Sequence, residues 1–242
     1  MHVAHEFDRR ADDLVAYARP THTGPDPRSD PGECHAHGPG PRSYPRGVPP
    51  DDGPTLNTER LILRRWLARD REPFARMNAD PEVTRHLSRA LNRDESDAFV
   101  DRIEAQVRER GFGLWAVERR DDRRFLGFTG LAAGVAGAPT PDAIEIGWRF
   151  DRFAWGHGYA TEAARAALRF GFEVACLPEI VSLTSVGHEA SRRVMERIGL
   201  HRDPADDFDH PRLAVDSPLR RHVLYRLTSE EYRRAADSPG TD

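Results

Sequence analysis

The sequence contains no lysine, so all 36 of its basic side chains are arginines. A P-loop nucleotide site uses a lysine to reach the phosphates, and a Schiff-base enzyme uses a lysine amine as its nucleophile. Both classes of site are therefore excluded for this chain.

Cysteines and long apolar runs are scarce as well. Cys34 and Cys176 are too few for a disulfide framework, and Cys176, near the end of an apolar helix, is expected to be a buried thiol. No run approaches the roughly 18 consecutive apolar residues that a membrane span needs. The charged opening MHVAHEFDRRADD lacks the apolar core of a secretory signal. We therefore expect a cytoplasmic protein without a membrane partner.

Positive charge is not in excess, because the formal net charge is −4. Proteins built to grip nucleic acid are usually strongly basic, so no nucleic-acid partner is expected. Cys34, His35 and His37 offer metal-ligating side chains, but their spacing is too tight for a standard structural zinc site. We therefore expect no bound metal.

The distribution of proline divides the chain. Residues 20–54 hold ten of the 19 prolines and very few apolar side chains. Such a segment cannot bury enough surface to offset the entropy of ordering. We predict a disordered Pro/Gly-rich extension over residues 1–54, a folded domain over 55–235 and a flexible tail over 236–242.

Apolar periodicity predicts the elements of the folded domain. The expected strands are residues 60–66, 112–118, 125–131, 144–150, 180–186 and 222–227. The expected helices are residues 70–79, 94–110, 160–175, 189–198 and 229–236, and the second of these opens at Asp94. Strands that first pair locally and then alternate with helices indicate an α/β fold with a mixed sheet and helices on both faces.

The most informative segment is residues 145–162, where a strand, a glycine-rich turn and a helix follow one another as EIGWRFDRFAWGHGYATE. Gly156 and Gly158 permit unusual φ angles and close backbone approach. The N–H groups of 156–161 would then meet at the positive end of a helix, which attracts a pyrophosphate without any cationic side chain. A tight turn without a ligand is the structural alternative.

Other motifs separate the candidate anions. The missing lysine excludes a P-loop, and Thr161 stands where a dinucleotide-binding fingerprint needs its third glycine. The remaining candidate is coenzyme A, and here the sequence resembles the GNAT superfamily of acyl-CoA-dependent N-acetyltransferases, specifically its RimJ/RimL-type branch. The resemblance covers residues 55–235 and is carried by the linked motifs TERLILRRW, EIGW, WGHGYATEA, EASRRVMERIGL and HVLYRL.

The resemblance implies a mostly antiparallel GNAT-like sheet and transfer of an acetyl group from acetyl-CoA to a primary amine, by direct attack in a ternary complex. Acetyl-CoA would be the co-substrate and the amine the acceptor, and a homodimer is a further possible assembly. The family's pyrophosphate loop corresponds in this chain to Trp155, Gly156, His157, Gly158, Tyr159, Ala160 and Thr161.

A second family pattern, Asn-x-x-Ala-x-x-x-Tyr, corresponds to the segment that begins at His188. Here His188 replaces the Asn, Ser191 the Ala and Met195 the Tyr. Ser191 and Met195 are typical of the RimJ/RimL-type branch, whereas His188 departs from it. His188 is still expected to contact the pantetheine arm or the neighbouring strand, and its protonation is expected to make that contact sensitive to pH.

Three chemical tasks fall to residues near the loop. Glu145, on the strand that enters the loop, is the expected general base, acting directly or through water; a salt bridge to Arg149 is its structural alternative. Backbone N–H groups near Trp148, Arg149 and Phe150, where the family splays the strand, are expected to polarise the thioester carbonyl. Ser191 is expected to donate to the leaving sulfur, or else to satisfy local backbone.

The sequence leaves the acceptor open. Deprotonating a lysine amine at pH 7 costs roughly 4–5 kcal/mol but an α-amine only about 1 kcal/mol, so a modest base favours an N-terminal amine. Protein N-termini, aminoglycosides, polyamines and small metabolites all remain, because the loops 67–93 and 203–220 carry no recognisable code. A non-catalytic acyl-CoA-binding module is the alternative function, since His188 and Met195 differ from the superfamily pattern.

Overall fold

The computed structural model describes residues 53–133, 138–140 and 143–237. Nearly all of the predicted N-terminal extension lies outside these ranges, as do residues 238–242 of the predicted tail. The boundaries proposed for these two segments therefore stay predictions. The folded region begins with β1 (Leu56–Asn57) and ends with α6 (Ser229–Asp237).

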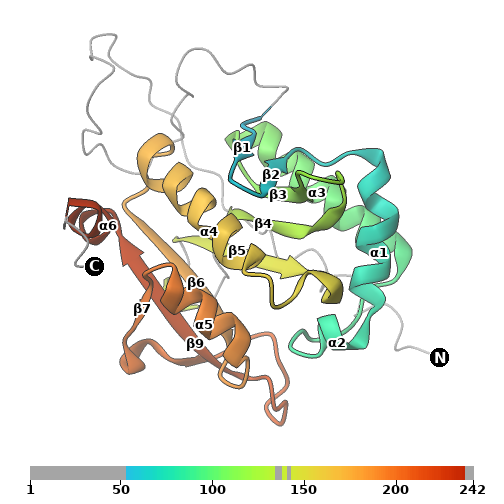
Figure 1. The fold of residues 1–242 in the computed structure, drawn as a ribbon. Coiled ribbons are helices and arrows are strands. Elements are labelled where there is room, and N and C mark those ends of the chain that lie inside the picture. The colour runs from blue at the N-terminus through green and yellow to red at the C-terminus, as the bar shows by residue number, and fades with distance from the viewer. Residues whose placement is uncertain (1–52, 134–137, 141–142, 238–242) are drawn as a thin grey trace.

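A single sheet forms the centre of the described region (Figure 1). Every neighbouring pair of strands is antiparallel except β5 and β6, which run parallel. The mixed, mostly antiparallel sheet confirms the predicted fold class. In spatial order the strands are β1, β2 (Leu61–Arg64), β3 (Leu114–Arg119), β4 (Phe125–Ala133), β5 (Ile144–Phe150), β6 (Glu179–Ser185), β9 (Arg221–Thr228) and β7 (His201–Arg202), with β8 (Phe208–Asp209) also on β9.

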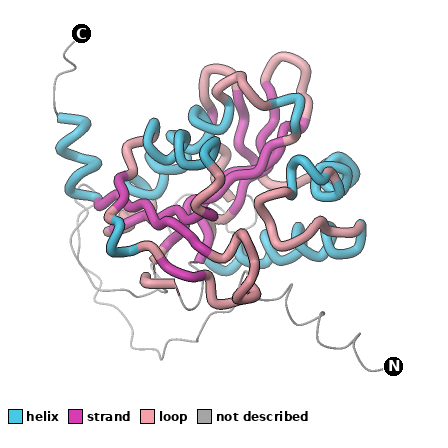
Figure 2. The backbone as a smooth tube through the Cα atoms, turned by 90° about the horizontal axis from the view of Figure 1, so that it is seen from below, coloured by secondary structure: helices cyan, strands magenta, loops and turns pink. Residues whose placement is uncertain are grey.

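Helices cover both faces of this sheet, as predicted, and Figure 2 shows them on either side of the strands. One face carries α4 (Tyr159–Arg169) and α5 (Glu189–Arg197), and the other carries α1 (Arg71–Ala79) and α3 (Arg93–Arg110). The short helix α2 (Pro81–Thr84) follows α1. Single helical turns occupy Ala68–Asp70, Arg152–Ala154, Phe170–Val174 and Pro204–Asp206.

The two faces of β5 point toward two different apolar cores. Ile146 and Phe150 belong to the core beneath α4, where the small side chains of Ala163, Ala164 and Ala167 allow close packing. The second core lies between the sheet and helices α1 and α3, and it is built around Trp66, Phe74, Phe99 and Phe128. Because side chains alternate along a strand, Glu145, Gly147 and Arg149 face the α1 and α3 side.

Several local predictions need correction. The N-cap of α3 is Asn92, which forms a capping box with Glu95, so the helix does not open at Asp94. The predicted helix 160–175 ends as a helix at Arg169 and continues as one π-helical turn. Cys176 is only partly buried and is disulfide-bonded, so the expectation of a core thiol is wrong. Strands β1, β7 and β8 have two residues each, too short for periodicity to reveal.

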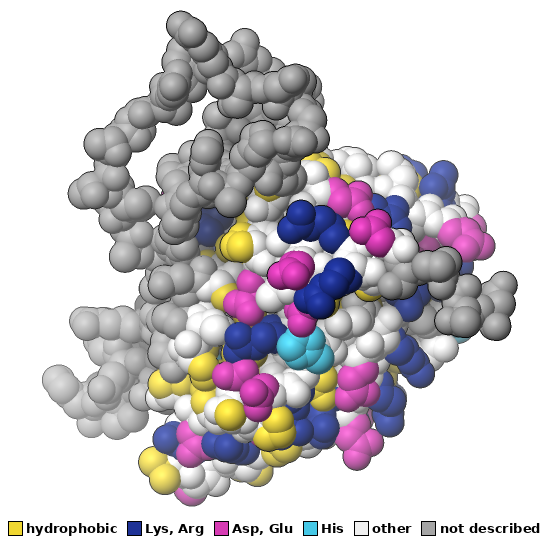
Figure 3. Space-filling model, turned by 90° about the vertical axis from the view of Figure 1, so that its left-hand side faces the viewer, with side chains coloured by type: hydrophobic (Ala, Val, Ile, Leu, Met, Phe, Trp, Pro, Cys, Tyr) yellow, Lys and Arg dark blue, Asp and Glu magenta, His cyan; other side chains and the backbone are white. Residues whose placement is uncertain are grey.

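A buried ion cluster joins β2, β3 and the turn before α1. Arg64 pairs with Asp70 at 2.7 Å and with Glu118 at 2.6 Å, and both carboxylates are almost fully shielded from solvent. Arg69 and Arg123 also contact Glu118. Burial opposes the charge of Arg64, but hydrogen bonds to Asp70 and Glu118 leave its pKa above the usual value. At the surface, acidic and basic side chains are interspersed over the described part of the face in Figure 3.

Candidate active site

The sheet opens between β5 and β6. Their parallel pairing consists of two register pairs, Ile144 with Ile180 and Glu145 with Val181. Beyond these pairs the Ser182 hydroxyl donates to the Ile146 carbonyl at 2.9 Å, and no further β5–β6 register pair follows. The rest of β5 therefore presents a main-chain edge toward β6 without a neighbouring strand, as the resemblance to the GNAT superfamily predicted.

The hydrogen bonds along β5 show which residues face this opening. The Gly147 carbonyl accepts from the Thr129 hydroxyl on β4 at 3.0 Å, whereas the Phe150 carbonyl accepts from the Trp155 indole at 2.8 Å. Because backbone groups alternate along a strand, the N–H and C=O of Trp148 face the opening. The main chain of Arg149 faces β4, so among the predicted polarising groups the N–H groups of Trp148 and Phe150 face the opening.

The glycine loop between β5 and α4 has the geometry expected of an anion site. Gly156 and Gly158 both have φ +79°, and Gly158 is the N-cap of α4. The first helical hydrogen bond runs from the Glu162 N–H to the Gly158 carbonyl at 3.1 Å. The N–H groups of Tyr159, Ala160 and Thr161 therefore have no acceptor within the helix and lie at its positive end. Residues 155–158 are exposed, so a ligand can reach them.

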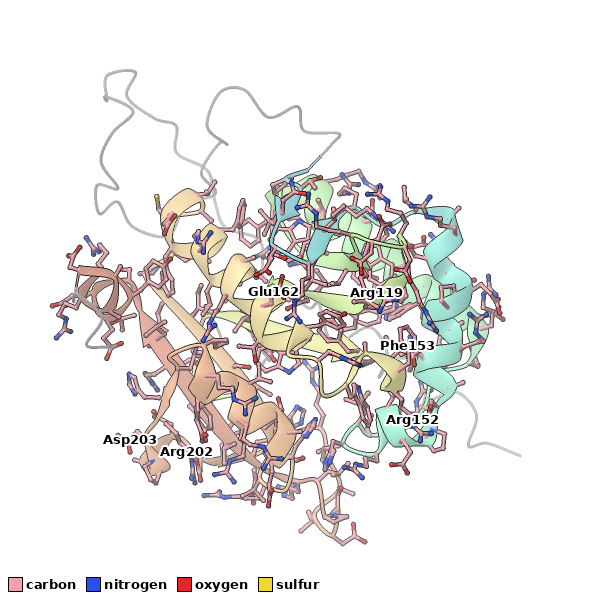
Figure 4. The ribbon with its side chains drawn as sticks, in the orientation of Figure 1. Arg119, Arg152, Phe153, Glu162, Arg202 and Asp203 are labelled. Carbon is pink, nitrogen blue, oxygen red and sulfur yellow. The ribbon has the colours of Figure 1, made fainter. Side chains whose placement is uncertain are left out.

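Arg60, which the sequence analysis did not identify, braces this loop. Its guanidinium donates to the His157 carbonyl at 3.0 Å and lies over the Tyr159 ring, with the carbon 4.8 Å from the ring centroid. It also pairs at 2.6 Å with Glu162, whose position on α4 is labelled in Figure 4. Arg60 precedes the loop by 97 residues, and no sequence pattern relates the two.

Glu145 has a carboxyl group with no partner in the described part of the chain. Among the described residues it forms no hydrogen bond and no ion pair, and Arg149 donates to Asn78 instead, so the predicted alternative of a salt bridge to Arg149 is wrong. The side chain is partly buried, and burial raises the pKa of Glu145 to about 8. A carboxyl group with that pKa can exchange a proton near neutral pH, as a general base must.

Arg149 is held by neutral groups. Its guanidinium donates to the Asn78 side-chain oxygen on α1 at 2.6 Å, and the Asn78 amide donates to the Ser96 hydroxyl on α3 at 2.8 Å. The guanidinium also lies 5.5 Å from the Phe128 ring centroid. Burial lowers the pKa of Arg149 to about 10, and the group is still charged at neutral pH. The position of Asn78 was not predicted, because a buried polar residue on a helix breaks the apolar periodicity.

His188 lies at the N-terminus of α5 and stacks on His86, with ring centroids 4.0 Å apart and planes within 9°. The loop after α2 therefore meets the first turn of α5 beside the opening. Burial, His86 and Arg85 lower the pKa of His188 to about 4. Both rings are then neutral at pH 7, so the expected pH sensitivity of this contact does not apply near neutrality.

Ser191 lies in the first turns of α5, only 8% exposed, on the side of the helix that also buries Met195. Its hydroxyl has no hydrogen-bond partner among the described residues. The structural alternative, in which the hydroxyl satisfies local backbone, is therefore not observed. Of the two neighbouring arginines, Arg193 pairs with Glu189 one turn earlier and Arg192 donates to the Val186 carbonyl.

Two further expectations concern metals and membranes. Within the described ranges, no three His, Cys, Asp or Glu side chains gather as a metal-binding group, and Cys34, His35 and His37 lie outside those ranges. In the same part of the chain, no helix combines the length and the apolar character that crossing a membrane requires.

Comparison with known proteins agrees with this geometry. The sequence model of the acetyltransferase (GNAT) domain matches residues 60–201. The uncharacterized protein YkkB of Bacillus subtilis is 34% identical over 147 residues, which cover 60% of this chain and 84% of that protein. A protein of Aspergillus fumigatus named FsC-acetyl coenzyme A-N(2)-transacetylase is 31% identical over 191 residues, covering 75% of this chain and 79% of its own.

Solved structures share the fold. An acetyltransferase of the GNAT family from Bacillus anthracis superposes with a TM-score of 0.62 at 23% identity, over 73% of this chain and 99% of that one. The acetyltransferase from Agrobacterium tumefaciens superposes with a TM-score of 0.59 at 26% identity, over 78% and 99% of the two chains. The chain therefore belongs to the family of GNAT acetyltransferases.

Proposed function

We propose that this protein moves the acetyl group of acetyl-CoA to a primary amine by direct attack in a ternary complex, with Glu145 as the base. The observation that carries the proposal is the unpaired Glu145 carboxyl, its pKa raised to about 8 by burial. This carboxyl lies where β5 and β6 part, on the strand that leads to the anion-binding loop. Membership of the GNAT family indicates acetyl-CoA as the acetyl donor, and the geometry of the site supports the role given to each residue.

In the proposed reaction, Glu145 accepts the proton that the attacking nitrogen loses as the new N–C bond forms. The Trp148 N–H, which faces the opening, is placed to donate to the thioester oxygen as negative charge develops there. The C–S bond then breaks, and the Ser191 hydroxyl would donate to the departing thiolate. The coenzyme's pyrophosphate would bind the free N–H groups at the start of α4, which are those of Tyr159, Ala160 and Thr161.

The acceptor that best fits this base is an α-amine. A free α-amino group has a pKa of about 7.7–8.0, close to that of Glu145, whereas a lysine amine is near 10.4. A protein N-terminus or a small molecule with an α-amine therefore needs little help to lose its proton. The name of the Aspergillus relative gives N(2) as the accepting atom. The linked motifs support a place in the RimJ/RimL-type branch.

Two measurements test the proposal. Calorimetric titration with acetyl-CoA should show binding, and a screen of amine classes that includes N-terminal peptides should show CoA release. The chain has no lysine, so its own side chains contribute no amine background to an acetylation assay. Binding without CoA release across the whole panel would instead support the non-catalytic acyl-CoA-binding module, and absence of binding would contradict both functions.

Replacing Gly158 with Ala should weaken acetyl-CoA binding at least about tenfold. The new Cβ would be held at φ +79°, which costs roughly 1–2 kcal/mol, and would lie 3.6 Å from an Arg60 nitrogen at the mouth of the loop. Gly199→Ala is the matched control, because it imposes similar backbone strain at φ +92° with no atom within 4 Å. Calorimetry on both variants checks the result, and equal affinities would contradict a role for the loop.

A further inference from the structure

Glu145 and Arg149 lie on the same face of β5, and the residue between them on that face is Gly147. A Cβ added at Gly147 would meet no atom within 4 Å, so the space between the Glu145 and Arg149 side chains is open. This face is turned toward α1, as the contact of Arg149 with Asn78 shows, and away from α4. The anion-binding loop belongs to the α4 side, so a ligand that reaches Arg149 belongs to the acceptor side of the sheet.

Within the described ranges, no acidic side chain compensates the charge of Arg149. Among the described residues, its one side-chain hydrogen bond runs to the neutral Asn78, and no carboxylate lies within ion-pair distance. Arg64, by contrast, is a buried arginine with a structural role, and two carboxylates neutralise its charge. Arg149 is partly buried, and removing a cation from water without a counter-charge is unfavourable, so a bound anion would offset that cost.

The guanidinium of Arg149 is also held in a fixed orientation that leaves part of it open to a ligand. One of its nitrogens is fixed by Asn78, which is 0% exposed and is itself fixed by the equally buried Ser96. The remaining guanidinium N–H groups have no acceptor among the described residues. An arginine fork that is oriented on one edge and open on the other suits a carboxylate, which can accept two parallel hydrogen bonds.

We propose that Arg149 binds a carboxylate of the acceptor while the acceptor's amine is presented to Glu145, so that the acceptor is a short peptide or a similar amino carboxylate. This proposal rests on the acetyl transfer proposed above. Four residues of extended strand separate the two α-carbons by roughly 13 Å. Because both side chains rise from the same face of the strand, an acceptor that contacts both must carry its amine and its carboxylate well apart, and an extended dipeptide spans roughly 7 Å.

Glycylglycine and glycylglycinamide form the test pair, because both carry an α-amine and only the first ends in a carboxylate. For the wild-type protein, kcat/KM should be at least tenfold higher for glycylglycine, mainly through a lower KM. In Arg149→Gln this ratio should fall to about one. The matched control is Arg152→Gln, an exposed arginine beside α2 that pairs with Asp80 at 3.7 Å (Figure 4) and should leave the ratio unchanged.

A second variant keeps the test sound if Arg149→Gln fails to fold. Asn78→Asp would place a carboxylate on Arg149 at the present 2.6 Å contact, and the Ser96 hydroxyl can still donate to it. This variant should keep or raise the melting temperature and yet lose the preference for glycylglycine. A fall of the glycylglycine to glycylglycinamide ratio of kcat/KM to about one in either variant supports the proposal.

The outcomes separate this inference from the proposed function. If the wild-type protein acetylates the amide as well as the free peptide, or if the ratio survives in both variants, Arg149 does not read a carboxylate while acetyl transfer stands. If acetyl-CoA does not bind, or no amine in the screen releases CoA, the proposed function fails and this inference fails with it.

Discussion

Replacing Glu145 with Gln is expected to lower kcat about 100- to 10,000-fold, the usual contribution of a general base. Acetyl-CoA affinity should change little, because the donor is expected to contact the main chain of β5 and the loop. In the wild-type protein kcat should rise with pH through about 8, as Glu145 loses its proton. The variant should lose the part of that rise that belongs to Glu145 and keep only the part that comes from deprotonation of the acceptor's own amine. A pH profile that is the same in both proteins would exclude Glu145 as the base.

The same substitution should stabilise the fold at high pH. Burial raises the pKa of Glu145 from an ordinary value near 4.5 to about 8, so the folded protein holds the proton more tightly than the unfolded chain. Wild-type stability therefore falls as pH rises from about 5 to 8, and Gln, which never ionises, avoids this loss. Thermal unfolding should show equal melting temperatures near pH 4 and a variant higher by several degrees at pH 9. A gap that does not widen with pH would contradict the raised pKa.

The second large effect is expected at Glu118. Glu118→Gln removes the carboxylate that Arg64, Arg69 and Arg123 share and leaves Arg64 with Asp70 alone. Breaking a buried ion pair by removing one partner costs roughly 3–5 kcal/mol. For a domain of this size, the melting temperature should fall by roughly 10 °C.

Asp122→Asn is the matched control for Glu118→Gln. It removes a carboxylate from the turn of the same β3–β4 hairpin, but Asp122 is 43% exposed and its ion pair with Arg119 is screened by water. The melting temperature should therefore barely change. Equal losses in the two variants would show that burial of the Glu118 cluster adds nothing to stability.

The elements around the site were predictable because local patterns specify them. The clean alternation of Ile144, Ile146, Trp148 and Phe150 predicted β5 with its observed bounds. Apolar periodicity predicted the helix that includes α4, and the two glycines predicted the loop. In each case residues close in sequence act on one element, so periodicity or turn chemistry is enough.

The tertiary partners of the site were not predictable by the same means. Arg60 reaches the His157 carbonyl across 97 residues, and Asn78 reaches Arg149 across 71. His86 stacks on His188 from a loop without a recognisable pattern. None of these pairings leaves a local signature, because each depends on which strands become neighbours in the sheet. The unpaired state of Glu145 was missed for the same reason.

Because β5 separates from β6, the single strand β5 can contact both substrates. On the proposed function, the donor meets main-chain atoms of β5, which every residue possesses, whereas the acceptor meets side chains such as Glu145 and Arg149. Substitutions in evolution can therefore change the side chains that select the amine, while the main-chain contacts with the thioester stay the same. Such an enzyme can change which amines it accepts while the acetyl-transfer step stays the same. Arg149 is the position where a substitution would first change the acceptor.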